Sequence, residues 1–216
     1  MTAKKAAVSG LTTRHIVYLI VMHTIGAMIL DAGINFGLAT AMYKNNKNAV
    51  FIWPLPNSLA GDIAVTIIIQ QALTWILDRL AVRGDLKKGL VAPLRMPSDA
   101  SRVVRWFVGL EDVKAPGRPG FVFHFKRVVV LIVASFLLYW PITIGILYGL
   151  RNGGVGAATG DHAGEFNLWP FPQILKGVYS ACLGLTTPFV SYVTLIYEGE
   201  NQAAATGAEE AKSTTA

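Results

Sequence analysis

Residues 128–150 read VVVLIVASFLLYWPITIGILYGL and contain no charged side chain. A helix of this length extends about 35 Å, which is enough to cross the hydrocarbon core of a bilayer. Because such a helix is apolar on every side, it would expose a large hydrophobic patch on a protein dissolved in water. The stretch therefore predicts a membrane-spanning helix, and Lys126 and Arg127 mark its beginning.

Three more apolar runs predict three more spans. Apolar residues make up 53% of the 216 residues and charged residues 15%, a balance that is typical of lipid contact. A cleaved signal peptide is the main alternative for the first run, but its length and the polar Asp31 and Asn35 within it favour a retained helix. We predict an all-α membrane protein, a four-transmembrane-helix bundle, with spans at about 16–43, 59–77, 128–150 and 174–197.

The spans divide the chain into five segments. The final segment is rich in Ala, Thr, Gly and Glu, which predicts disorder. The predicted segments are a basic leader (1–14), a first two-span repeat (15–80), a basic loop (81–125), a second two-span repeat (126–198) and a disordered tail (199–216).

The distribution of Lys and Arg predicts the orientation of the spans. The leader, the central connection and the tail together carry 15 of these residues. The other two connections carry only three, namely Lys44, Lys47 and Arg151. Because basic loops stay in the cytosol, we expect both termini and the central loop on the cytosolic side.

Two matched blocks predict an internal repeat. DAGINFGL at 31–38 aligns with TIGILYGL at 143–150, and WPLPNSLAG at 53–61 aligns with WPFPQILKG at 169–177. Each copy holds two spans, so both copies enter the membrane from the same side. The fold is therefore expected to consist of two tandem parallel two-helix repeats.

Each predicted copy carries a G-x-x-x-G motif in its first span. Gly33 and Gly37 form one motif, and Gly145 and Gly149 form the other. Glycines four residues apart share a helix face and let another backbone approach closely. We interpret them as helix-packing residues, either inside the monomer, which we favour, or between monomers.

Each copy also carries a Trp-Pro-x-Pro element ahead of its second span. Trp favours the headgroup level of a membrane, and Pro suits the extended entry to a helix. The elements are therefore interpreted as interface anchors, and the alternative is a platform that binds a partner or a lipid headgroup. The residues are Trp53, Pro54, Pro56, Trp169, Pro170 and Pro172.

Polar residues inside the first two predicted spans form the candidate functional site. An acid such as Asp31 is costly in lipid unless it finds a partner, which makes it a functional candidate. The structural alternative is that Gln70 or Gln71 satisfies Asp31 in a hydrogen-bonded core. The candidate intramembrane polar residues are His23, Asp31, Asn35, Gln70 and Gln71.

The central loop contains a short amphipathic segment. Val103, Val104, Phe107 and Leu110 form an apolar stripe, and Ser98 or Asp99 precedes them as a candidate helix cap. Such a basic segment is expected to lie on the cytosolic leaflet and to favour anionic lipids.

The two Trp-Pro-x-Pro elements between paired spans give the chain a resemblance to known sequences. Over residues 14–198 the arrangement resembles uncharacterised fungal four-span integral membrane proteins, and each half resembles bacterial two-span domains of unknown function. The resemblance implies the fold and no activity.

The sequence favours a non-enzymatic scaffold or accessory subunit, because it shows no recognisable nucleophile, nucleotide loop or metal cluster. The alternative is a small ion, proton or solute transporter that uses Asp31 and the Gln70 and Gln71 region. An intramembrane enzyme ranks third. We expect no cofactor, no metal and no nucleic acid. The expected partners are the lipid bilayer of a plasma membrane or endomembrane and either a membrane protein or a second copy of the chain.

Overall fold

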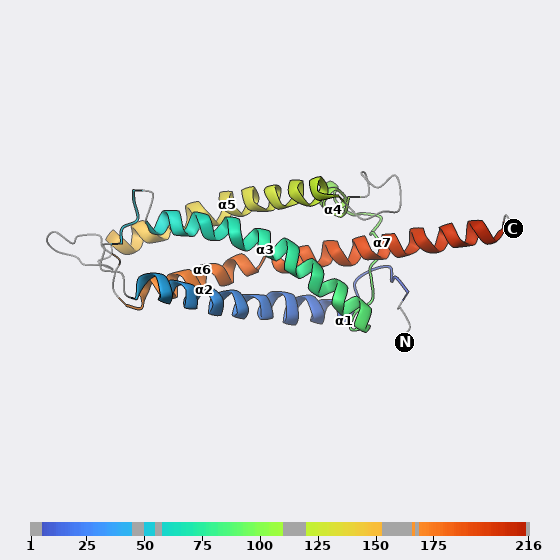
Figure 1. Cartoon of the computed structure of the whole chain (residues 1–216), viewed down its shortest axis with the longest axis horizontal. Coiled ribbons are helices and arrows are strands. Elements are labelled where there is room, and N and C mark those ends of the chain that lie inside the picture. The colour runs from blue at the N-terminus through green and yellow to red at the C-terminus, as the bar shows by residue number, and fades with distance from the viewer. Residues whose placement is uncertain are drawn as a thin grey trace. The chain divides into compact units, whose positions relative to one another are not determined.

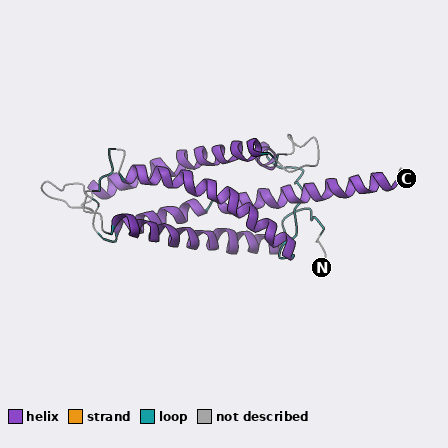
Figure 2. Cartoon of the chain, viewed as in Figure 1, coloured by secondary structure: helices purple, strands orange, loops and turns teal. Residues whose placement is uncertain are grey.

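The computed structural model describes residues 6–44, 50–54, 58–109, 120–152, 166 and 169–214, and side chains as far as residue 207. The regular structure of these residues is helical (Figure 2). An isolated parallel bridge pairs Val8 with Leu94.

Helical segments follow one another along the chain as labelled in Figure 1. Three consecutive segments make the first long helix, and α6 and α7 follow each other after a short break that precedes Pro188. The segments are α1 (Thr13–Val17), the π-helix η1 (Tyr18–Gly26), α2 (Ala27–Tyr43), α3 (Leu59–Lys88), α4 (Arg102–Val108), α5 (Phe121–Asn152), α6 (Phe171–Gly184) and α7 (Thr187–Thr214).

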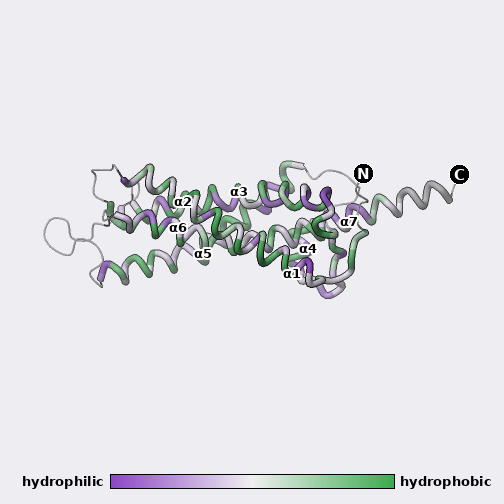
Figure 3. The backbone as a smooth tube through the Cα atoms, turned by 90° about the horizontal axis from the view of Figure 1, so that it is seen from below, coloured by the Kyte–Doolittle hydropathy of each residue, from purple (hydrophilic) through white to green (hydrophobic). Residues whose placement is uncertain are grey.

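Four helical stretches are long and apolar enough to cross a membrane. They cover Thr13–Tyr43, Leu59–Lys88, Phe121–Asn152 and Phe171–Gly207. Hydrophobic residues recur along α2, α3 and α5 (Figure 3). The prediction of a helical fold with four long apolar helices is therefore confirmed.

Two helices extend beyond boundaries that the sequence predicted. Helix α3 continues to Lys88, past the end of the span predicted at 59–77. Helix α7 continues to Thr214, into the segment predicted as a disordered tail from residue 199. Both extensions have a physical cause. Asp78 and Arg79 are buried and not solvated, and the Ala, Glu, Gln and Lys residues of the tail are good helix formers.

The chain folds into two compact units. Unit 1 holds residues 1–24, 74–127 and 186–216, and unit 2 holds residues 25–73 and 128–185. Each unit draws on both halves of the sequence, so neither corresponds to one of the predicted two-span repeats.

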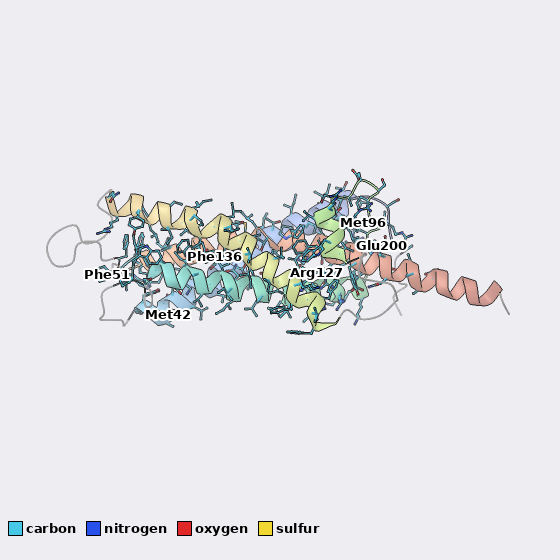
Figure 4. The ribbon with its side chains drawn as sticks, turned by 90° about the horizontal axis from the view of Figure 1, so that it is seen from above. Met42, Phe51, Met96, Arg127, Phe136 and Glu200 are labelled. Atoms are coloured by element: carbon cyan, nitrogen blue, oxygen red, sulfur yellow. The ribbon has the colours of Figure 1, made fainter. Side chains whose placement is uncertain are left out.

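Unit 2 has a hydrophobic core supplied by α3, α5 and α6 and by the segment before α3. Helix α2 packs along α6. The indole nitrogen of Trp140 on α5 donates to the carbonyl of Ala60 on α3, at 3.1 Å. Phe136 on α5, labelled in Figure 4, packs against this core, and its ring stacks on that of Trp140. The most buried core residues are Val50, Ile52, Leu59, Ala60, Ile63, Ile67, Leu147, Phe166, Tyr179 and Leu183.

Unit 1 is built around α7. The Leu94 amide donates to the Leu195 carbonyl at 3.1 Å, so the segment after α3 lies against α7. Gly199 makes this close approach possible, because a Cβ there would lie 2.0 Å from the Leu94 carbonyl oxygen. The next residue of α7, Glu200, accepts from the Met96 amide at 2.9 Å, and Glu200 and Met96 lie together in Figure 4.

Helix α4 covers part of the amphipathic segment that was predicted in the central loop. Its cap is Ser101, whose side chain accepts from the Val104 amide, and not Ser98 or Asp99. Phe107 is buried, with its ring 5.0 Å from that of Phe189 on α7, whereas Val103 is exposed. The apolar stripe is therefore divided between the interior of unit 1 and the surface, and Leu110 lies outside the described residues.

Candidate functional site

Asp31 and Gln70 meet inside unit 2. The Gln70 amide nitrogen donates to Asp31 Oδ2 at 2.8 Å and to the Ser180 carbonyl at 2.9 Å. Asn35 donates to the backbone carbonyl of Asp31, one turn away, and not to its carboxylate. Gln71 is fully buried in the same unit. The hydrogen bond that the structural interpretation of Asp31 requires is thus present.

Unit 2 also contains a buried ion pair that the sequence did not indicate. Lys176 on α6 contacts Asp62 on α3, with Nζ and Oδ1 2.5 Å apart and side chains only 9% and 13% exposed. The Tyr43 hydroxyl donates to the other oxygen of Asp62 at 3.1 Å. Three helices therefore converge on one carboxylate.

His23 belongs to unit 1, whereas Asp31 belongs to unit 2, and His23 pairs with Asp78. His23 Nδ1 and Asp78 Oδ1 are 2.5 Å apart, and the Ser191 hydroxyl donates to Asp78 Oδ2 at 2.7 Å. All three residues are buried. His23 also packs against the ring of Tyr18, whose hydroxyl donates to Asp85.

The order of this Ser, Asp and His group decides its chemistry. In a serine hydrolase the imidazole lies between the serine and the carboxylate, so that it can take the proton of the nucleophile. Here the carboxylate of Asp78 lies between His23 and Ser191, and Ser191 has no contact with the imidazole among the described residues. The arrangement gives the buried carboxylate of Asp78 two hydrogen-bond partners, and it lacks the serine–imidazole contact of a serine hydrolase.

Arg127, at the start of α5, holds α4 in place within unit 1. Its side chain is fully buried, and it donates to the carbonyls of Trp106, Phe107 and Phe123. Trp106 and Phe107 lie in the last turn of α4, where a cation offsets the partial negative charge of the helix end. Figure 4 labels Arg127 at this position.

Among the described residues, the four motif glycines make no close contacts. A Cβ placed at Gly33, Gly37, Gly145 or Gly149 would meet no atom of these residues within 4 Å. Helix packing through these glycines, inside the monomer or between monomers, therefore stays a prediction. Helix α6 supplies the close approach to α2 instead, through two other glycines. A Cβ at Gly177 would lie 3.4 Å from the Ala32 carbonyl, and one at Gly184 would lie 3.0 Å from Asp31 Oδ2.

Both Trp-Pro elements lie in unit 2. The Trp53 ring meets Trp140 of α5 edge-on at 5.8 Å, and the Trp169 ring meets Phe36 of α2 at 6.4 Å. Both tryptophans remain partly exposed, and the peptide bonds that precede Pro54 and Pro170 are cis. Pro172 is buried in the first turn of α6, and Pro56 lies outside the described residues.

Several buried charges escaped sequence reasoning, because their partners are far apart along the chain. Asp62 and Lys176 are separated by 114 positions and His23 and Asp78 by 55. One sequence signal was available: Lys176, Ser180, Thr187, Ser191 and Thr194 recur at intervals of three, four or seven residues, which places them on one stripe of a helical period.

Comparison with known proteins finds a family and relatives of unknown function. Residues 120–195 match a family described as "Protein of unknown function (DUF2456)". The chain is similar to uncharacterised fungal proteins. An uncharacterised protein of Schizosaccharomyces pombe is 32% identical over 206 residues, and one of Saccharomyces cerevisiae is 23% identical over 251 residues.

The extent of the matches differs between these relatives. They cover 85% and 86% of this chain, but 38% of the S. pombe protein and 78% of the S. cerevisiae protein. The chain thus spans less than half the length of the S. pombe relative. No solved structure matches.

Proposed function

We propose that the chain is a multi-pass integral membrane protein that acts without catalysis, as a scaffold or accessory subunit. The observation that carries the proposal is the arrangement of polar and apolar side chains on the same helices. Large apolar side chains point outward, with Leu30 63% and Leu137 70% exposed, whereas Gln70, Asp78 and Ser191 are buried and hydrogen-bonded. This distribution suits lipid and is costly in water.

The contacts of unit 2 support the two-repeat arrangement. Trp53 of the first predicted repeat packs against the first span of the second, and Trp169 of the second packs against the first span of the first. Contacts exchanged in this way suit copies related by an axis along the membrane normal. The excess of basic residues on one side supports cytosolic termini and a cytosolic central loop.

Extraction tests the membrane part of the proposal. Membranes from cells that express the chain are washed with alkaline carbonate, and detergent is then added to the pellet. A spanning protein stays in the pellet and dissolves only in detergent, whereas release by carbonate alone would contradict the proposal. Native purification tests the scaffold part, for which we expect a co-purifying protein partner or selected lipids. A lone monomer without lipid preference would count against that part.

A specific observation supports transport as a second candidate. Gln70 Oε1 and Ser180 Oγ are buried without a hydrogen-bond partner among the described residues, and both residues belong to the Asp31 group. Polar atoms of this kind could serve a passing ion, proton or small solute.

Flux measurements separate the two candidates. The chain is placed in proteoliposomes with Asp31→Asn as the test variant and Asp99→Asn, at an exposed acid, as the control. A transporter requires flux in the wild-type protein and in Asp99→Asn, with loss of flux in Asp31→Asn. The absence of wild-type flux across protons, alkali cations and small solutes would eliminate transport and leave the scaffold.

A further inference from the structure

Arg79 of α3 is a buried cation with few partners. It is 3% exposed, and its Nη1 reaches Thr194 Oγ1 only at 3.5 Å, the long limit of a hydrogen bond. Its Nη2 is buried and has no hydrogen-bond partner among the described residues. The guanidinium carbon lies 5.0 Å from the ring centre of Trp75 and 5.2 Å from that of Tyr197.

The carboxylates around Arg79 are bound to other groups. Glu198 is close enough to act on Arg79 electrostatically, but its Oε1 lies 2.6 Å from Arg83 Nε. Asp78, the preceding residue, is bonded to His23 and Ser191. Among the described residues, Arg79 therefore has no ion-pair partner.

Other cations add to the local charge. Arg83 and Arg127 are both near enough to repel Arg79. Arg127 is already bonded to backbone carbonyls, which carry no net charge. Arg79 and Arg83 thus share the carboxylate of Glu198, and the nearby charge of Arg127 adds to the repulsion on Arg79.

The energetics of this cluster favour an additional anion. Burial of a charged group is costly unless an opposite charge offsets the lost hydration, and the cation–π contacts of Arg79 supply no opposite charge. An anion that binds the buried guanidinium would remove this imbalance. A phosphate group fits best, because its oxygens match the planar donors of Arg.

We propose that Arg79 and Arg83 form a binding site for an anionic phosphate group. The side chains of Arg83 and Glu198 are 36% and 26% exposed, so solvent reaches the cluster at this pair. The incoming phosphate displaces Glu198 from Arg83 and binds both guanidinium groups. A lipid headgroup and free phosphate have the required chemistry in common. The site goes beyond the proposed scaffold role, and the free-phosphate form does not depend on membrane insertion.

Binding to the purified full chain in a non-ionic detergent tests the site. One arm adds phosphatidic acid in mixed micelles, with phosphatidylcholine as the reference lipid, and the other adds inorganic phosphate. Bound lipid is counted by native mass spectrometry, and both ligands are titrated by thermal shift. Circular dichroism checks the fold of every variant.

Three variants give distinct expectations. Arg79→Gln weakens binding about tenfold or more, because it removes charge-assisted hydrogen bonds. Glu198→Gln tightens binding, because the phosphate no longer competes with a carboxylate for Arg83. Lys87→Gln removes an exposed cation from the same helix and leaves the affinity within about twofold, which controls for general attraction.

The outcomes decide both the site and the source of the phosphate. Arg79-dependent binding of phosphatidic acid alone identifies a lipid headgroup, and the same dependence for inorganic phosphate identifies a free anion. Binding that changes equally in Arg79→Gln and Lys87→Gln, or no saturable binding in either arm, overturns the proposal. If Arg79→Gln does not fold, Glu198→Gln decides: tighter binding supports the site, and unchanged or weaker binding overturns it.

Discussion

Lys176 and Asp62 illustrate how individual residues stabilise unit 2. Their charged atoms are 2.5 Å apart, and both side chains are largely removed from solvent. Tyr43 satisfies the second oxygen of the carboxylate. A buried pair of this kind contributes little compared with a well-packed apolar pair, but the loss of one partner leaves an uncompensated charge.

We therefore predict that Lys176→Met destabilises the protein by about 3–5 kcal/mol. Lys87→Met, at an exposed position, changes stability by no more than about 0.5 kcal/mol. Thermal unfolding in detergent measures both values. The double variant Lys176→Met with Asp62→Asn should recover part of the loss, since it removes the orphaned charge. Equal stability of Lys176→Met and the wild-type protein would contradict the assignment.

Two buried serines, Ser191 and Ser180, differ in their hydrogen bonding and allow a matched comparison of stability. Ser191 donates to the carboxylate of Asp78, whereas the hydroxyl of Ser180 has no hydrogen-bond partner among the described residues. Ser191→Ala should cost about 1–3 kcal/mol, because a buried charged acceptor loses its donor. Ser180→Ala should be close to neutral. Chemical unfolding in mixed micelles measures the free energy of unfolding of both variants. Equal losses of stability would contradict the assignment of a hydrogen bond to Ser191 alone.

Sequence reasoning identified the pairing of Asp31 but not that of His23. An acid inside an apolar run requires a donor, and Gln70 and Gln71 were the amides available in the next span, so the Asp31 contact could be anticipated. Asp78 lies just beyond the span predicted at 59–77, and its pairing with His23 was not anticipated. Hydropathy cannot reveal that a charge is buried when its partner is more than 50 positions away.

At the scale of elements, the approach of α2 to α6 depends on glycines of α6. Gly184 has the tighter environment, since a Cβ there would lie 3.3 Å from the backbone of Met28 as well as close to Asp31. A Cβ placed at Gly33 on α2 would meet no atom of the described residues within 4 Å. The spacing of glycines predicts a face on which close packing is possible, but it cannot show whether another helix occupies that face.

Alanine substitutions at Gly184 and Gly33 should change the stability of the protein in opposite directions. Gly184→Ala should destabilise the protein by about 1–3 kcal/mol, because the added methyl group overpacks the contact with α2. Gly33→Ala should stabilise it by about 0.5–1 kcal/mol, because Ala is the better helix former. Unfolding midpoints measured in the same detergent test both. A destabilising Gly33→Ala would show that its face is packed after all.

The positions of the helix ends depend on tertiary contacts, whereas the existence of the helices does not. The apolar runs predicted the existence of all four long helices, because length and hydropathy need no tertiary information. The ends could not be predicted, since α3 passes through Asp78 and Arg79 by burying both. The cap of α4 was displaced for a similar reason, because the burial of Phe107 and Val108 in unit 1 determines where the helix lies.

At the scale of the whole molecule, the account rests on four apolar helices and on an uneven distribution of basic residues. Composition and charge lead to the same expectation, namely an even number of crossings with both termini in the cytosol. Four consecutive crossings also fix the sides of the connections, because neighbouring spans run in opposite directions. The two connections that follow the first span of each repeat must lie on the same side of the membrane.

Labelling of single cysteines with a membrane-impermeant maleimide tests this condition most directly. The native Cys182 is first replaced by Ala, and one cysteine at a time is introduced at Ser9, Lys44, Ser98 or Arg151, all exposed positions. In sealed vesicles with the cytosolic face outward, the account predicts labelling at positions 9 and 98, and at 44 and 151 only after detergent is added. Labelling of all four in sealed vesicles, or different behaviour of 44 and 151, would contradict it.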